Sequence, residues 1–339
     1  MSSAKNCFVQ CCDVCFADFF RFFSAYLTCL IKTGILQILF ERRNQGTPDA
    51  EAMSRHNLTF LLGSVLKPPL IELDDEGNYK YGMCTINVVR GYRDAGDHKN
   101  FMKSDNPIII TRDASVLKEI ETWQENDIVF VKGVIAAKTI QKGSFCQHCG
   151  GRNSAEGTLV YVNPIYAEKR VHLNTQEEAL KYLSEHREIS NQVYILGTLC
   201  RDPKKITPKE GLIVTQYQIA LNRKYFIRSD PPSIKADYPW VKSYGQNAVD
   251  DKERLHVGSK VFIDGCLQAR SVQKHAVCIH CGEKYDWKDR AMEIVPYETE
   301  YICDYYTDTD IEEKRRRETQ AALNKVFGEE DTSELSEEL

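Results

Sequence analysis

The chain has 339 residues, of which 42% are apolar and 27% are charged, and its net charge is −5. This length gives room for two or three domains, and this charge argues against a uniformly basic nucleic-acid binder. The last 36 residues hold twelve acidic and five basic side chains, a net charge of −7, which leaves +2 on the other 303 residues. The sequence therefore describes a near-neutral body with an acidic tail.

Residues 1–52 differ from the rest, because they combine five cysteines with a long apolar run. Arg21 and Lys32 interrupt that run, which makes it a poor membrane span. We expect a helical N-terminal extension or translation from a start codon upstream of the true one, with Met53 as the natural start. A membrane anchor is the other interpretation. Three cysteines here could bind a metal but have no partner pair nearby: Cys11, Cys12 and Cys15.

After Met53 the chain repeats itself. The segment 129–151, VFVKGVIAAKTIQKGSFCQHCGG, parallels the segment 261–283, VFIDGCLQARSVQKHAVCIHCGE. Other segments match in the same order, with an offset of 134 residues early and 132 later. Such order over more than a hundred residues predicts a tandem duplication. The copies are a first repeat, residues 57–172, and a second repeat, residues 191–303.

Each repeat is expected to be all-β, since its apolar and β-branched residues alternate or run together as they do in half-buried strands. Gly197 and Gly265 interrupt strands and predict bulges or sharp bends. Five short strands in about 110 residues are typical of a small closed barrel.

Two helices are predicted outside the repeats. Residues 173–190 should form a linker helix, because Thr175 and Glu178 have the spacing of a capping box. The acidic tail, residues 304–339, should begin with a helix capped near Asp310 and end in a disordered polar stretch.

The second repeat resembles the OB-fold core of bacterial and phage single-stranded DNA-binding proteins. The resemblance rests on NQVYILGTLCRDP, YQIALNR, YPWVKSYG and HVGSKVFIDGCLQAR, which occur in the family's order. It implies two tandem OB-fold barrels joined by a helix. The chain departs from the family in fusing two such folds, in placing a Cys-x-x-Cys pair in each, and in a tail that ends SEEL.

Single-strand binding without sequence preference needs flat side chains for base stacking and cations along the backbone path. By the resemblance, Tyr225, Tyr238 and Tyr244 fall where the family places stacking aromatics. The alternative is that the aromatic side chains belong to the core. The predicted contacts are Arg223, Lys224, Tyr225, Phe226, Tyr238, Trp240, Lys242, Tyr244, Arg270 and Lys274 in the second repeat, and Arg90 and Tyr92 in the first.

Two further cations, Lys288 and Arg290, could line the same path. The first repeat offers less for stacking. It has Asn106, Ile108 and Arg112 where the second has aromatic side chains. We therefore expect the second repeat to carry most of the contact with DNA.

The two Cys-x-x-Cys pairs each supply half of a four-ligand zinc site. If the repeats pack about a pseudo-twofold axis, Cys146, Cys149, Cys278 and Cys281 would form one Cys₄ zinc centre. Thiols without metal, or completion of each pair by a second chain, are the alternatives. The histidines inside the pairs, His148 and His280, are interpreted as non-ligands. Four single cysteines are expected to be small core residues: Cys84, Cys200, Cys266 and Cys303.

No P-loop, nucleophile elbow or His-Glu-x-x-His motif occurs, so we do not expect an enzyme or a small-molecule substrate. The sequence predicts a cytoplasmic protein that binds single-stranded DNA in replication, recombination or repair. Its tail would contact replication or repair proteins, and the oligomeric state is open, with a homo-oligomer as one option. The alternatives are a zinc-stabilised adaptor in a replication complex and an accessory domain of a nucleic-acid enzyme such as a nuclease.

Overall fold

The computed structural model describes residues 56–91, 102–209, 211–223, 225, 227 and 234–327. The predictions for residues 1–52 and for the polar end of the tail lie outside these residues. Within them, no helix is long and apolar enough to cross a membrane.

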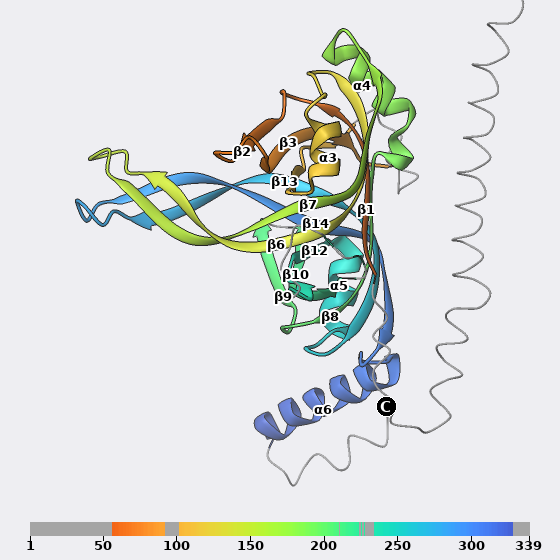
Figure 1. Cartoon of the computed structure of the whole chain (residues 1–339). Helices are drawn as coiled ribbons and strands as arrows, with labels where there is room; N and C mark the ends of the chain where they lie inside the picture. The colour runs from red at the N-terminus through yellow and green to blue at the C-terminus, as the bar shows by residue number, and fades with distance from the viewer. Residues whose placement is uncertain are drawn as a thin grey trace, which may run out of the picture. The chain divides into compact units, whose positions relative to one another are not determined.

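The described residues are mostly β, and their fourteen strands join in one sheet (Figure 1). Each repeat also holds one α-helix, at residues 114–120 and 245–254, so the prediction of all-β repeats is corrected. The strands are β1 (His56–Val65), β2 (Leu70–Leu73), β3 (Tyr79–Val89), β4 (Ser104–Asp105), β5 (Ile108–Thr111), β6 (Asp127–Phe145), β7 (Arg152–His172), β8 (Asn191–Leu199), β9 (Lys204–Lys209), β10 (Leu212–Asn222), β11 (Ala236–Asp237), β12 (Trp240–Tyr244), β13 (Lys260–Val277) and β14 (Lys284–Cys303). The helices are α3 (Ala114–Ile120), α4 (Gln176–Glu185), the 3₁₀ helix η3 (Arg187–Ile189), α5 (Gly245–Arg254) and α6 (Asp308–Phe327).

Each half of the chain pairs five strands in a closed cycle. The first cycle runs β1–β3–β5–β7–β6 and returns to β1, and the second runs β8–β10–β12–β14–β13 and returns to β8. In both cycles one pair is parallel, at Ile109 opposite Val162 and at Val241 opposite Ile294. These two pairs are 132 residues apart, so the strand order is repeated at the same spacing as the sequence motifs.

The antiparallel pair β1–β8 joins the two cycles. Thr59 lies opposite Val193, its equivalent in the second repeat, and the register extends evenly on both sides of this pair. A local twofold axis therefore passes between Thr59 and Val193. The buried side chain of Asn57 exchanges two hydrogen bonds with the backbone of Ile135, both 2.9 Å. Its equivalent in β8, Asn191, does the same with the backbone of Leu267.

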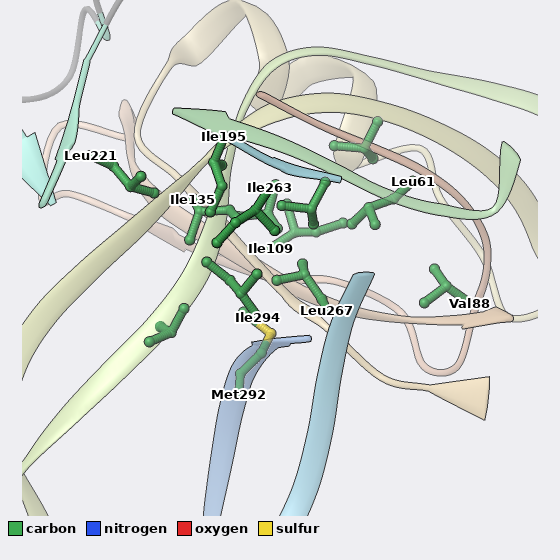
Figure 2. Packing of buried hydrophobic residues seen from close by; sticks show 14 of the residues in the cluster. Leu61, Val88, Ile109, Ile135, Ile195, Leu221, Ile263, Leu267, Met292 and Ile294 are labelled. Carbon is green, nitrogen blue, oxygen red and sulfur yellow. The ribbon is translucent and has the colours of Figure 1, made fainter. Parts of the chain in front are cut away.

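One hydrophobic core runs through both cycles (Figure 2). Leu61 and Ile109 from the first repeat belong to the same cluster as Ile195 and Ile263 from the second, and all four are fully buried. Alternate side chains of the paired strands face this core, as period-two patterning requires. The two repeats are therefore packed as one body and not as two beads on a linker.

The glycine predicted to bend β13 does mark an irregularity. The register of β13 against β14 shifts between Asp264 and Gly265. A Cβ atom added at Gly265 would lie 2.4 Å from the carbonyl oxygen of Val295, so only glycine allows this approach. Gly133 occupies the equivalent shift between β6 and β7.

The capping box predicted at Thr175 and Glu178 forms, and it begins α4. At α6, reciprocal hydrogen bonds join Thr307 to Asp310, which places the cap three residues before Asp310.

The four single cysteines divide into two pairs. Cys84 and Cys266 are buried as predicted, and burial raises the pKa of the Cys84 thiol to about 12. Cys200 and Cys303 are only half-buried, which corrects their assignment to the core.

Candidate nucleic-acid interface and metal centre

Two long hairpins extend beyond the strand cycles and cross each other on the left of Figure 1. We call residues 138–159 the first arm and residues 270–291 the second arm. The Lys142 ammonium of the first arm lies 2.8 Å from Oδ1 of Asp289 in the second. Near the tips, Ser144 and Tyr285 share a hydrogen bond of 2.7 Å between their hydroxyl groups. Polar contacts thus fix the arms against one another along their length.

Each arm ends in a knuckle formed by a Cys-x-x-Cys pair. The backbone N–H of Gly150 donates to the carbonyl oxygen of Cys146, and that of Gly282 donates to the carbonyl oxygen of Cys278, both at 2.9 Å. These two glycines have φ values of +70° and +76°, a conformation that favours glycine. The two knuckles therefore have the same backbone geometry.

The four knuckle sulfurs come together in one cluster, as the sequence predicted. All four Sγ atoms lie within 4.8 Å of one another. The sulfurs of Cys146 and Cys281 are 3.7 Å apart, and those of Cys149 and Cys278 are 3.6 Å apart. A tetrahedral ion with metal–sulfur bonds of about 2.3 Å places its ligands about 3.8 Å apart. The cluster therefore has the dimensions of a Cys₄ metal site.

The environment of the sulfurs favours a thiolate at Cys278. Burial would raise its pKa, but backbone N–H groups of Cys281 and His280 and the amide of Asn153 outweigh burial and lower the pKa to about 6. At Cys281 the backbone N–H of Glu283 also lowers the pKa of the thiol. Burial and the neighbouring sulfurs outweigh it there and raise the pKa to about 12. A second thiolate is thus opposed by the first, and a bound cation offsets this repulsion.

Side chains between the cysteines do not join the sulfur cluster. The ring Nε2 of His280 donates to the carbonyl oxygen of Arg152, 3.0 Å away. Asn153 of the first arm holds the other knuckle, because its Oδ1 accepts from the backbone N–H of Ile279 and its Nδ2 lies 3.5 Å from the sulfur of Cys278. His148 is exposed and outside the cluster. These positions agree with the interpretation of both histidines as non-ligands.

Two of the predicted DNA contacts, Arg223 and Arg90, bind carboxylates that also contact the other repeat. The guanidinium of Arg223 makes two bonds to Asp237, of 2.5 and 2.9 Å, and Asp237 also accepts from the backbone N–H of Ala137 in the first repeat at 3.0 Å. Arg90 binds Asp105 in the same bidentate way, at 2.6 and 3.0 Å. Asp105 in turn accepts from the second repeat, from the backbone N–H of Ala269.

Three further predicted cations also have carboxylate partners. Glu293, only 6% exposed, accepts from Lys242 and Arg270, each at 2.8 Å. Burial would raise the pKa of Glu293, but these two cations outweigh it and lower the pKa. Lys274 pairs with Asp289 at 2.7 Å and lies over the ring of Trp287. Lys242 is buried, so it offers no free ammonium on the surface.

The predicted aromatic side chains are more accessible. Tyr238 is 49% exposed, and Tyr225, Trp240 and Tyr244 are half-buried, so the four do not form a buried core. The guanidinium of Arg201 lies 6.0 Å from the centre of the Trp240 ring. Sequence reasoning missed Arg201, although a cation directly after the opening strand of the repeat was a usable signal. Lys224, Phe226 and Tyr92 lie outside the described residues.

The first repeat has an apolar row on the face that corresponds to the Trp240 face of the second repeat. Its row of side chains across β2, β3 and β5 is Leu70, Met83 and Ile110. The equivalent row across β9, β10 and β12 is Lys204, Gln216 and Lys242. Leu70 is 54% exposed and Met83 38% exposed. The two repeats therefore present chemically different faces from the same strand positions.

Comparison with known proteins finds similarity in the second repeat. Residues 190–277, which hold β8 to β13, match the family model described as the single-strand binding protein family. The single-stranded DNA-binding protein of Aquifex aeolicus (strain VF5) is 30% identical over 84 residues, 25% of this chain, and the chain spans 57% of that relative's length.

Among solved structures, a deletion mutant of the single-stranded DNA binding protein from Thermus aquaticus has a TM-score of 0.48 at 14% identity. The match covers 76% of this chain and 99% of that one. The wild-type Thermus aquaticus protein gives 0.46 at 14% identity, over 75% and 96% of the two chains. A Plasmodium falciparum SSB in complex with ssDNA gives 0.27 at 16% identity, over 39% and 99%. The residues that match the family model include Tyr238, Trp240 and Tyr244.

Proposed function

We propose that this chain is a tandem OB-fold protein that binds single-stranded DNA without strong sequence preference and does so mainly through its second repeat. The observation that carries the proposal is Trp240, half-buried on β12 with the Arg201 guanidinium over its ring, within the region that matches the single-strand binding family. Such a pair offers a base both a stacking surface and a cation. DNA replication, recombination and repair are the processes that expose this ligand.

The DNA path follows the aromatic side chains of the second repeat. Tyr238 and Trp240 supply the most direct stacking surfaces, and the exposed cations of the turn and strand beside them, Arg201 and Lys204, supply charge. Because bound phosphates release counterions, affinity should fall as salt rises. The first repeat, with Ile108 where the second has Trp240, contributes little stacking.

The test is a titration of fluorophore-labelled dT oligomers with the full chain, followed by fluorescence anisotropy, so that the signal does not depend on Trp240. Trp240→Ala should weaken binding by at least several-fold, since a stacked base contributes about 1–3 kcal/mol. The matched control is Ile108→Ala, at the equivalent place in the first repeat, which should leave affinity unchanged. Absence of binding by the wild-type chain at low salt would refute the function. Equal losses in the two variants would refute the assignment to the second repeat.

We propose zinc as the ion of the Cys₄ centre. Four thiolates in tetrahedral array are typical of zinc, with iron as the competing ion. Cys146 and Cys149 from one arm and Cys278 and Cys281 from the other would hold it, and the ion would supply structural charge neutralisation, with no catalytic step. Metal analysis of the purified chain should find one zinc per chain. Iron in its place, or no metal, would contradict this assignment.

The exposed apolar row of the first repeat favours a second function, contact with a protein partner. Leu70 and Met83 lie where the second repeat has polar side chains, so this face is suited to an apolar surface. Leu70→Ser with Met83→Ser should leave dT affinity within twofold of the wild type. A large loss of DNA affinity would place DNA on this face and exclude the protein-binding function.

A further inference from the structure

An open groove lies where the second arm passes the first repeat. Its volume is about 380 Å³. The first repeat contributes Ser104, Asp105 and Asn106, and the second arm contributes Arg270, Lys288 and Arg290 among others. The groove is thus a product of the packing of the two repeats and exists in neither alone.

The two carboxylates at the groove are held by other groups. Asp105 is bound by Arg90 and by the backbone N–H of Ala269. Asp289 is held between the ammonium groups of Lys142 and Lys274, at 2.8 and 2.7 Å. Neither carboxylate is therefore available to neutralise a further cation.

Lys288 and Arg290 carry the free charge of this groove. Both are exposed, and neither forms an ion pair with any residue that the structure describes. Arg290 donates to the backbone carbonyl of Asn106, which fixes it beside the first repeat. The two residues are two positions apart on β14, so they face the same side about 6.8 Å apart.

The equivalent positions of the first arm lack this charge. At the repeat spacing of 132 residues, Glu156 replaces Lys288 and Thr158 replaces Arg290. Register confirms the equivalence, because Arg290 lies opposite Ser271 and Thr158 lies opposite Thr139. Only one of the two symmetry-related positions is cationic, so a general surface charge does not explain it.

We propose that this groove binds the phosphodiester backbone of single-stranded DNA as the strand passes from the second repeat onto the first. The proposal rests on the proposed function. A polyanion fits better than a small anion, because the groove is open and its two free cations are spaced along a strand and do not converge on one point. Lys288 and Arg290 would contact neighbouring phosphates, and the backbone at Asn106 would border the path on the side of the first repeat.

The test measures how the dT affinity of the full chain depends on salt. For a single strand, the slope of log K against log salt is negative, and its magnitude decreases by about 0.7 for each phosphate that the protein no longer neutralises. Lys288→Ala with Arg290→Ala should therefore reduce the magnitude of this slope by about 1.4. The quenching of tryptophan fluorescence at saturating dT, which reports stacking on Trp240, should be retained. The control is Lys118→Ala with Lys181→Ala, which removes equal charge from exposed helix positions and should leave the slope unchanged.

The other results of these titrations separate a failure of the groove proposal from a failure of the proposed function. A wild-type slope in the groove variant overturns the proposal and leaves the proposed function intact. An equal change in the control variant also overturns it, since the effect would then be general. Failure of the wild-type chain to bind dT overturns both. Because Arg290 also contacts Asn106, Lys288→Ala alone provides a check that leaves that hydrogen bond in place, with an expected change of about 0.7.

Discussion

Replacing Arg223 with Ala separates a role in DNA contact from a role in holding the repeats together. The Arg223 side chain is 8% exposed and that of Asp237 is 1% exposed, so the substitution leaves a buried carboxylate without its cation. Among the described residues, Asp237 would keep only the 3.0 Å bond from the backbone N–H of Ala137. Breaking a buried ion pair on one side costs about 3–5 kcal/mol. We expect a loss of that size in the free energy of unfolding.

Urea unfolding measures this loss, and a double-mutant cycle with Asp237→Asn identifies its source. If the loss comes from the unpaired charge, Arg223→Ala combined with Asp237→Asn should be more stable than Arg223→Ala alone. The salt dependence of dT binding should be unchanged in every variant that folds. The reasoning would be wrong if Arg223→Ala kept full stability and flattened the salt slope by about 0.7, because Arg223 would then bind a phosphate.

Three further outcomes are expected. Cys146→Ser and Cys278→Ser should each remove nearly all bound metal and lower the melting temperature, because one site takes ligands from both arms; metal analysis that found half the metal retained would indicate two separate sites. Burial raises the pKa of Asp251 to about 6, so its folded form binds a proton more readily than its unfolded form and stability falls as pH rises from about 4 to 6. Asp251→Asn should therefore stabilise the protein by about 2–3 kcal/mol at pH 7.5 and have little effect at pH 4, and urea unfolding that showed equal effects at both pH values would contradict this. Gly265→Ala should cost about 1–3 kcal/mol, because the new Cβ would lie 2.4 Å from the carbonyl oxygen of Val295, and an unchanged melting curve would show that the strands move apart without cost.

The sequence predicted the cysteine cluster well, because metal ligands have strict spacing and the duplication indicated that the two pairs could meet. It did not predict the ion pair of Arg223 with Asp237, because a cation beside aromatic residues has the same pattern whether it faces solvent or a buried carboxylate. A usable signal was present. Arg90 and Asp105 of the first repeat recur as Arg223 and Asp237 in the second, although the stacking side chains do not.

Residues needed for packing are required in both copies of a duplicated domain, whereas a surface that binds DNA can be kept in one. The ion pairs of Lys242 and Lys274 were unpredictable for another reason. Their partners Glu293 and Asp289 come from β14. The closed strand cycle brings Glu293 to Lys242, and the β13–β14 hairpin brings Asp289 to Lys274.

The twofold relation between β1 and β8 has a genetic consequence. In a dimer of identical chains, every substitution would appear on both sides of such an axis, so the two halves could not differ. Here both sides are encoded once each in a single chain, and a change in one repeat leaves the other untouched. Covalent fusion therefore allows one half to specialise while the shared contacts at the axis preserve the pairing.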